Sequence, residues 1–194
     1  MFFNLYYAII FPLIFSQLDL IDNFLNPIEV AKNITLDYYT GRWYQAATSR
    51  STALLGTGPN FTDVTADYYC IEDCLYNNIS VYNQGFDGEG IYKNISGYSY
   101  LEEGEEESAK RKLKFYSLPI EGNYWIVKLG PVIDFQYQYS IVTGPISKYF
   151  GTRFSLYVLS RNITEYIDNY EEEVKEWCKN NGFIYNWNEY IPTY

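Results

Sequence analysis

The stretch YYTGRWYQAATSR, residues 38–50, contains the run that decides the fold: Gly41, Arg42 and Trp43 stand together where an apolar segment begins. A glycine at this point lets the entering backbone approach its neighbours closely. A tryptophan at the mouth of a strand is a large aromatic surface whose indole face and N–H both need partners. We expect that partner to come from a part of the chain more than a hundred residues further on.

From Trp43 onward, the sequence has the period-two pattern of half-buried strands, in short segments separated by turns. In VTADYYC, for example, Val64 and Tyr68 alternate with Thr65 and Asp67. Similar segments lie near residues 79–85, 91–100, 112–116, 123–129, 137–143 and 153–161. With the strand at Trp43, these make about eight, and short connections favour antiparallel neighbours. The sequence therefore predicts an all-β fold, an eight-stranded antiparallel up-and-down barrel.

One helix is predicted over residues 164–181, within TEYIDNYEEEVKEWCKNNG. Its apolar positions recur three and four residues apart: Ile167, Tyr170, Val174, Trp177 and Cys178. Thr164 is the expected N-cap, and Gly182 is expected to end the helix. The segment at residues 153–161 is apolar on both faces, so we expect the helix to pack against it on the outside of the barrel.

The composition limits the functions that the chain can have. With 194 residues and 47% hydrophobic content, it is large enough for one domain with a real core. The net charge is −10 and no long basic cluster exists, so no nucleic acid is expected as a partner. The chain has no histidine, which excludes histidine-dependent triads and histidine-bound metals. The acidic run at residues 102–108 lacks any ligand spacing, so we predict no metal site and no cofactor.

The N-terminal residues indicate the secretory route. The chain is apolar from Phe2 to Phe15 apart from Asn4, which is shorter than the roughly 20 residues of a membrane span. Ser16 is a small residue at which a signal peptidase could cut. We predict a signal peptide at residues 1–16, an N-terminal extension at 17–34 and the barrel domain at 35–190. A short membrane anchor is the alternative for the first segment.

Five glycosylation acceptors agree with an extracellular or secretory-lumen location: Asn33, Asn60, Asn78, Asn94 and Asn162. Asn94 falls inside a predicted strand, and a glycan there would turn Ile95, Gly97 and Ser99 toward the interior.

The three cysteines leave their pairing open. Cys70 and Cys74 are close together near a turn, so a local disulfide is the shortest closure in an oxidising compartment. Cys178 would then be a buried thiol. The competing arrangement joins Cys178 to one of the other two.

On these residues, the sequence resembles the lipocalin family, and within it the branch of apolipoprotein D and the bacterial outer-membrane lipocalin. Gly41-Arg42-Trp43 matches the family's G-x-W motif, and Arg161 in LYVLSR matches the arginine that ends the last strand. The run IDF, residues 133–135, is a loose match to the second motif. The resemblance covers roughly residues 33–188. It implies that Arg161 packs on the indole of Trp43 at the closed end, so Gly41, Trp43 and Arg161 form a structural motif.

The position of Arg161 also predicts the interior of the barrel. If Arg161 points inward, strand alternation turns Leu159 and Tyr157 inward as well. The ligand-binding residues that we predict are mostly apolar and aromatic: Tyr68, Val81, Phe115, Trp125, Val127 and Tyr157. Such a lining suits an aliphatic chain or a flat apolar ring. The alternative is that these side chains simply fill the barrel.

The function that the sequence favours is a secreted, non-enzymatic carrier or scavenger of a small hydrophobic ligand: a fatty acid, lysolipid, sterol or retinoid-like molecule. A second hypothesis is an interaction protein whose loops bind a cell-surface receptor, with peripheral contact to a membrane as a further partner. A third is an enzyme that uses a cavity cysteine, with Cys70 at an inward position. Cys70 has no evident basic neighbour to lower its pKa, so the sequence disfavours catalysis.

Overall fold

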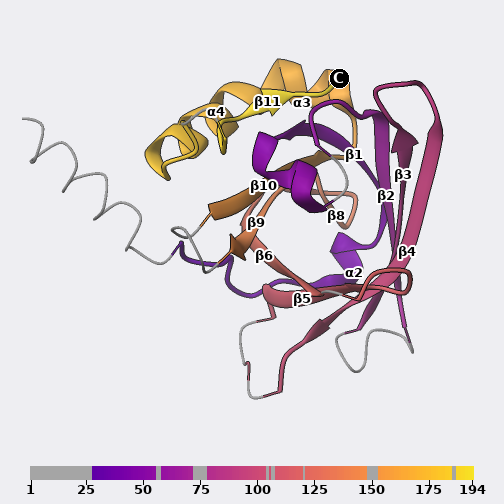
Figure 1. Ribbon diagram of the computed structural model, residues 1–194. Coiled ribbons are helices and arrows are strands. Elements are labelled where there is room, and N and C mark those ends of the chain that lie inside the picture. The colour runs from indigo at the N-terminus through magenta and orange to yellow at the C-terminus, as the bar shows by residue number, and fades with distance from the viewer. Residues whose placement is uncertain are drawn as a thin grey trace, which may run out of the picture.

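The computed structural model describes residues 28–55, 58–71, 78–103, 105, 108–119, 121–147, 153–184 and 187–194. Eight antiparallel strands close into a barrel, because the last of them pairs with the first (Figure 1). They are β1 (Gly41–Thr48), β2 (Thr62–Cys70), β3 (Ile79–Phe86), β4 (Tyr92–Leu101), β5 (Lys110–Phe115), β6 (Glu121–Leu129), β9 (Tyr139–Ser147) and β10 (Arg153–Ser160). The predicted fold is confirmed.

The closed end of the barrel is formed before the first strand begins. A single helical turn, α2 (Leu36–Tyr39), precedes β1, and its residue Tyr39 is fully buried. A small hairpin of β7 (Val132–Ile133) and β8 (Gln136–Tyr137) lies at the same end, between β6 and β9. The 3-10 helix η1 (Arg50–Leu55) follows β1 at the other end. The barrel therefore has one end covered by the chain and one end from which a cavity can open.

The alternation of side chains along β2 shows which face of the strand points into the barrel. Val64, Ala66 and Tyr68 are buried. Their registered partners continue the pattern on both sides, since Ala66 lies opposite Trp43 of β1 and Tyr68 lies opposite Val81 of β3. Because side chains alternate across a strand, the interior can be followed from one strand to the next around the barrel.

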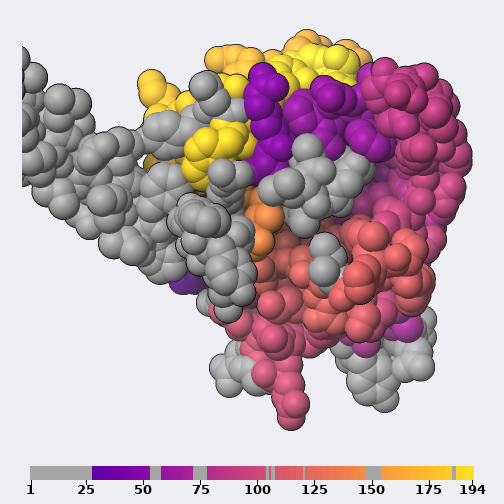
Figure 2. Space-filling model, in the orientation of Figure 1, coloured from indigo at the N-terminus to yellow at the C-terminus, as the bar shows by residue number. Residues whose placement is uncertain are grey.

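The C-terminal helical segment packs against the outside of the barrel, as predicted, and covers one side of it (yellow in Figure 2). It differs from the prediction in being two helices, α3 (Ile163–Asn169) and α4 (Glu171–Asn180), separated at Tyr170. The N-cap is Asn162, whose side chain accepts a hydrogen bond from the Glu165 N–H. The prediction of Thr164 as the cap was therefore wrong by two positions.

The buried face of α3 also differs from the predicted stripe. Tyr166 is fully buried, whereas Ile167 is 39% exposed. Tyr166, Tyr170, Val174 and Cys178 follow one another at a spacing of four, so the buried stripe passes through Tyr166 instead of the predicted Ile167. In α4, the predicted Val174 and Cys178 are buried, and Gly182 follows the helix with a φ of +81°. A short strand, β11 (Ile191–Pro192), ends the segment by pairing with β1.

Cys178 is a free and buried thiol, so the pairing of Cys178 with either of the other cysteines was wrong. Cys74 lies outside the described residues, and the local bridge from Cys70 to Cys74 stays a prediction. The signal peptide at residues 1–16 also lies outside them. Of the N-terminal extension, residues 28–34 are described, and the Ala31 N–H donates to the Ile126 carbonyl of β6. Among the described helices, none is long and apolar enough to cross a membrane.

Candidate functional site

The closed end is held by the contact between Trp43 and Arg161. The guanidinium carbon of Arg161 lies 3.8 Å from the centre of the Trp43 ring, and the indole N–H donates to the Tyr39 carbonyl at 2.8 Å. Trp43 is fully buried. A cation over an indole face contributes about 0.5–2 kcal/mol, depending on desolvation. The resemblance predicted this pair, and the structure confirms it.

Arg161 also donates hydrogen bonds to backbone carbonyls of α2 and of the start of β1. Its guanidinium donates to the carbonyls of Thr40 and Arg42, both at 2.7 Å, and to those of Tyr38 and Tyr39, both at 3.2 Å. Burial lowers the pKa of Arg161 to about 10, so the side chain stays charged at neutral pH. One side chain thus joins the end of the last strand to the entry of the first.

Gly41 is required at this point by its backbone and by its surroundings. Its φ is +92°, which L-residues with a Cβ rarely adopt. A Cβ built on it would lie 3.3 Å from Nη1 of Arg161.

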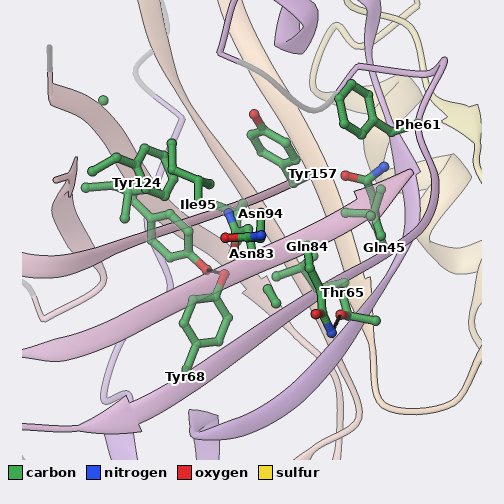
Figure 3. Close-up of a pocket in the computed structure, with 18 of the residues that line it drawn as sticks. Gln45, Phe61, Thr65, Tyr68, Asn83, Gln84, Asn94, Ile95, Tyr124 and Tyr157 are labelled. Carbon is green, nitrogen blue, oxygen red and sulfur yellow. Dashed lines mark hydrogen bonds between the residues drawn. The ribbon is translucent and has the colours of Figure 1, made fainter. Parts of the chain in front are cut away.

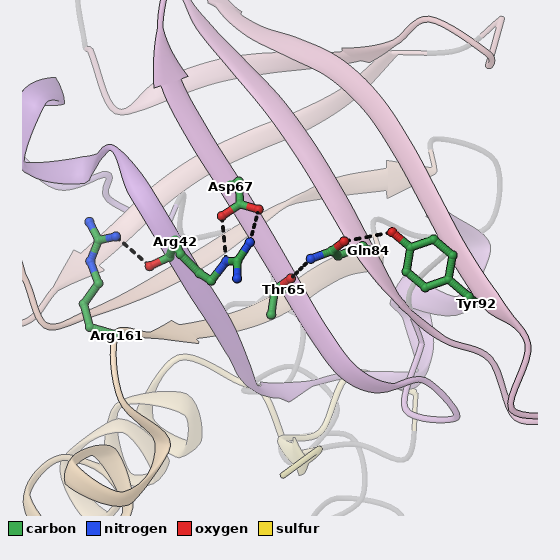
Figure 4. A network of polar contacts seen from close by, with 6 residues as sticks. All are labelled: Arg42, Thr65, Asp67, Gln84, Tyr92 and Arg161. Carbon is green, nitrogen blue, oxygen red and sulfur yellow. Dashed lines mark hydrogen bonds and ion pairs between the residues drawn. The ribbon is translucent and has the colours of Figure 1, made fainter.

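From Arg42 at this end, further polar contacts link the neighbouring strands along the barrel (Figure 4). Arg42 pairs with Asp67 of β2 through two hydrogen bonds, at 2.8 and 2.9 Å. Gln84 of β3 donates to Thr65, and Tyr92 of β4 donates to Gln84. These contacts cross-link four consecutive strands.

The barrel encloses a cavity of about 510 Å³, a size that suits a small organic ligand. Its walls are mostly apolar: Val64, Ala66, Ile95, Leu113, Phe115, Val142 and Leu159. Phe61, just before β2, and Tyr68, near the end of β2, lie at opposite ends of this cavity (Figure 3), and Lys93 and Leu118 also line it. The side chains therefore do not fill the barrel.

The structure places three of the six predicted ligand residues along this cavity: Tyr68, Phe115 and Tyr157. Val81 has the predicted inward position but is buried in the core beside Tyr68, and it does not line the cavity. Trp125 and Val127 do not line it either. Trp125 instead packs edge-to-face on Phe154, with 6.4 Å between the ring centres.

The error on β6 has a physical reason. NYWIVKL is apolar on both faces, because one face meets the cavity and the other is covered by neighbouring chain. Tyr124 takes the inward position that we assigned to Trp125, and a register shift between Ile126 and Lys128 interrupts the alternation beyond it. The side chain of Tyr124 was the available signal for the inward position. Its ring is apolar, and its hydroxyl needs a hydrogen-bond partner when it is buried.

Three tyrosines form a buried chain of hydroxyls at the deep end of the cavity. The Tyr39 and Tyr124 hydroxyls are 2.7 Å apart, Tyr124 donates to Tyr68 at 2.9 Å, and Tyr39 is 3.1 Å from the Ser140 hydroxyl. Burial raises the pKa of Tyr39 to about 12 and raises those of Tyr68 and Tyr124 further. All three hydroxyls are therefore protonated and uncharged at neutral pH.

Chemistry other than binding has little support from the described residues. They contain no group of three acidic, cysteine or histidine side chains placed to hold a metal. Cys70 has the predicted inward register, two residues after Tyr68, but no cysteine is among the described residues that line the cavity. Burial raises the pKa of Cys178 to about 12, which makes it a poor nucleophile.

The glycosylation acceptors lie where a sugar could be attached. Asn33, Asn60, Asn94 and Asn162 are exposed, and Asn78 is half-buried. Next to Asn94, Ile95 lines the cavity and Gly97 and Ser99 are buried. Asn94 itself also lines the cavity, so glycosylation at this position stays a prediction.

Comparison with known proteins gives a consistent result. The family model for the Lipocalin-like domain matches residues 34–188. Temperature-induced lipocalin-1 of Arabidopsis thaliana is 28% identical over 155 residues, covering 77% of this chain and 74% of that protein.

Two solved structures illustrate the shared fold. Insecticyanin of the tobacco hornworm, Manduca sexta, superposes with a TM-score of 0.64 at 15% identity, covering 87% of this chain and 84% of its own. Lobster apocrustacyanin A1 gives a TM-score of 0.59 at 17% identity, covering 81% and 77%. At these identities, the two likenesses concern the fold alone.

Proposed function

This chain belongs to the lipocalin family, and on that premise we propose that it carries or sequesters a small hydrophobic molecule in the barrel cavity. The observation that carries the proposal is the cavity of about 510 Å³ with mostly apolar walls. Fatty acids, lysolipids, sterols and retinoid-like molecules are the candidates. Burial of their apolar surface would contribute about 25 cal/mol per Å² before the costs of association.

Gly122 offers a direct test of the cavity as the binding site. It lines the cavity on β6, and a Cβ built on it would meet nothing within 4 Å. Gly122→Trp should therefore place a large ring in the cavity without a backbone clash. We expect at least about tenfold weaker binding of an environment-sensitive fluorescent fatty-acid probe, while the circular dichroism spectrum stays that of the wild type.

The matched control is Gly122→Ala, which adds one methyl group at the same position and should bind the probe nearly as the wild type does. Equal binding by Gly122→Trp and the wild type would show that the probe binds elsewhere. That result would remove the main support for the carrier proposal.

We extend the proposal to the secretory route, supported by the apolar leader and the exposed glycosylation acceptors. Expression in a eukaryotic secretory cell should release a chain that begins near Gln17 and loses mass on treatment with an N-glycosidase. Retention of residues 1–16 in the released protein would contradict the signal peptide.

A second candidate function is supported by the β7–β8 hairpin. Its turn residues Asp134 and Phe135 both have positive φ, and Phe135 is 74% exposed beside half-exposed Val132 and Ile133. Exposed apolar side chains of this kind are typical of contact surfaces. If the barrel is a scaffold for a cell-surface partner, Phe135→Ser should abolish binding to cells and leave probe binding unchanged.

A further inference from the structure

The hydroxyl chain at the deep end of the cavity leaves one proton unused. Each tyrosine hydroxyl has one proton to donate, and Tyr124 gives its proton to Tyr68. The Tyr39–Tyr124 hydrogen bond must then use the proton of Tyr39, and the Tyr39–Ser140 hydrogen bond must use that of Ser140. Tyr68 only accepts in this chain, and it donates to none of the described residues. Its O–H is therefore a free donor at the cavity wall.

A free acceptor lies on the next strand. Oδ1 of Asn83 is buried and has no hydrogen-bond partner among the described residues, and Asn83 lines the same cavity. An unpaired buried carbonyl oxygen costs about 1–3 kcal/mol, so it marks a position that a ligand donor would stabilise.

The donor and the acceptor share one face of adjacent strands. Tyr68 is registered with Val81 and Asn83 with Ala66, so Tyr68 and Asn83 are diagonal neighbours across β2 and β3. Such neighbours lie about 7–8 Å apart at the backbone, within reach of long side chains. Figure 3 shows both side chains at the deep part of the cavity, away from Phe61.

We propose that the cavity selects apolar molecules that end in a hydroxyl group, and that this hydroxyl binds at the deep end between Tyr68 and Asn83. The ligand oxygen accepts the proton of Tyr68 and donates its own proton to Oδ1 of Asn83. The apolar body of the ligand then lies along the walls toward Phe61 and Leu118. This inference rests on the proposed function and adds the chemical class of the ligand.

Other polar ends fit this pair less well. An ether or ketone accepts from Tyr68 but has no proton for Asn83. A carboxylate also lacks the proton and would place its charge beside the Asn83 oxygen in an apolar site. The lining lysine, Lys93, is registered with Gly85 toward the end of β3. Arg111 is buried on the same face of β5 as Leu113, but it does not line the cavity, and its guanidinium donates to Ser99 and to the Ser108 carbonyl.

The test compares three probes with the same dodecyl chain: dodecanol, dodecyl methyl ether and tridecanoate. Their affinities for delipidated protein at neutral pH would be measured by displacement of the fluorescent fatty-acid probe. The alcohol should bind about tenfold more tightly than the ether and the carboxylate, because it alone satisfies both groups.

Two nearly isosteric variants test whether Tyr68 and Asn83 cause the preference for the alcohol. Tyr68→Phe removes the donor, and Asn83→Leu removes the acceptor. Each should reduce the preference for dodecanol over the ether to about twofold or less, with ether binding largely retained. Tyr157→Phe is the control, since it removes a hydroxyl from the wall formed by β10 and should leave the preference intact.

The possible results separate this inference from the proposed function. Equal affinity of the wild type for the three probes, or an unchanged preference in both variants, overturns the hydroxyl site and leaves the carrier function standing. Failure of all three to displace the probe, together with failure of the probe itself to bind, contradicts the carrier function.

Discussion

At the scale of single residues, the closed end is where the sequence was most informative. Gly41, Trp43 and Arg161 are recognisable in the sequence because each meets a specific requirement. Gly41 adopts a positive φ, Trp43 needs a cover for its large ring, and Arg161 donates to backbone carbonyls. No such pattern marks Asn83, because an asparagine in an alternating strand has the same appearance whether it lines a cavity or faces solvent. The polar part of the candidate site therefore became visible only in three dimensions.

Gly41→Ala should destabilise the protein through both backbone and packing. A residue with a Cβ at positive φ costs about 1–2 kcal/mol, and the new methyl group would lie against Arg161. The free energy of unfolding in urea should fall by about 1 kcal/mol more than in Gly90→Ala. Gly90 also has positive φ, at +75°, but its Cβ would meet nothing within 4 Å. Equal losses in the two variants would show that the space beside Arg161 is not limiting.

Trp43→Ala should lower the free energy of unfolding by about 3–5 kcal/mol, the range for removal of a buried aromatic side chain. The same change at Trp125, which is only half-buried, should cost clearly less. Chemical denaturation of the two variants is the measurement. A loss below about 1 kcal/mol for Trp43→Ala would be incompatible with its burial under Arg161.

At the scale of elements, the strands were predictable and the face of some of them was not. Segments that alternate polar and apolar residues, such as β2, show their orientation in the sequence. On β6, both faces carry apolar side chains that are at least partly buried, so periodicity could not distinguish Tyr124 from Trp125. The break between α3 and α4 was missed because no glycine or proline marks it in the sequence: Tyr170, with φ −128° and ψ −21°, suits a continuous helix by its residue type.

The attachment of α4 to the barrel should depend on pH through Glu173. Its carboxylate lies 2.7 Å from Nζ of Lys128 on β6 and accepts a hydrogen bond from Tyr139 on β9. The Lys128 hydrogen bond is the main cause that holds the pKa of Glu173 below its ordinary value of 4.5. A carboxyl group whose pKa is lowered by folding stabilises the folded protein at pH values above its ordinary pKa. This stabilisation is lost as the pH falls through the pKa of the folded state.

Glu173→Gln should therefore be slightly less stable than the wild type at pH 7, by at most about 1 kcal/mol for this partly exposed pair. The difference should vanish as the pH falls below about 4, the region in which ordinary glutamates become protonated. Denaturant titrations at several pH values would measure it, with Glu176→Gln, an exposed change on the same helix, as the control. A difference that stays constant with pH would contradict the role of the carboxylate.

At the scale of the whole molecule, the sequence predicted a closed barrel but could not decide whether it was filled. Occupancy depends on the summed volume of many interior side chains, and errors such as that at Trp125 change the sum. The structure supplies a cavity with apolar walls and a polar deep end. The family, the fold and this cavity together support the carrier proposal, and the side chains at the deep end support the proposed ligand class.

The central claim is that the cavity binds a small apolar molecule, and native mass spectrometry of the secreted, enzymatically deglycosylated protein tests it most directly. We predict a complex heavier than the bare chain by the mass of a small organic molecule, which solvent extraction releases. Gly122→Trp, purified in parallel, should give the bare mass. A wild-type protein that shows only the bare mass, and still does so after incubation with a lipid extract of the producing cells, would contradict the account.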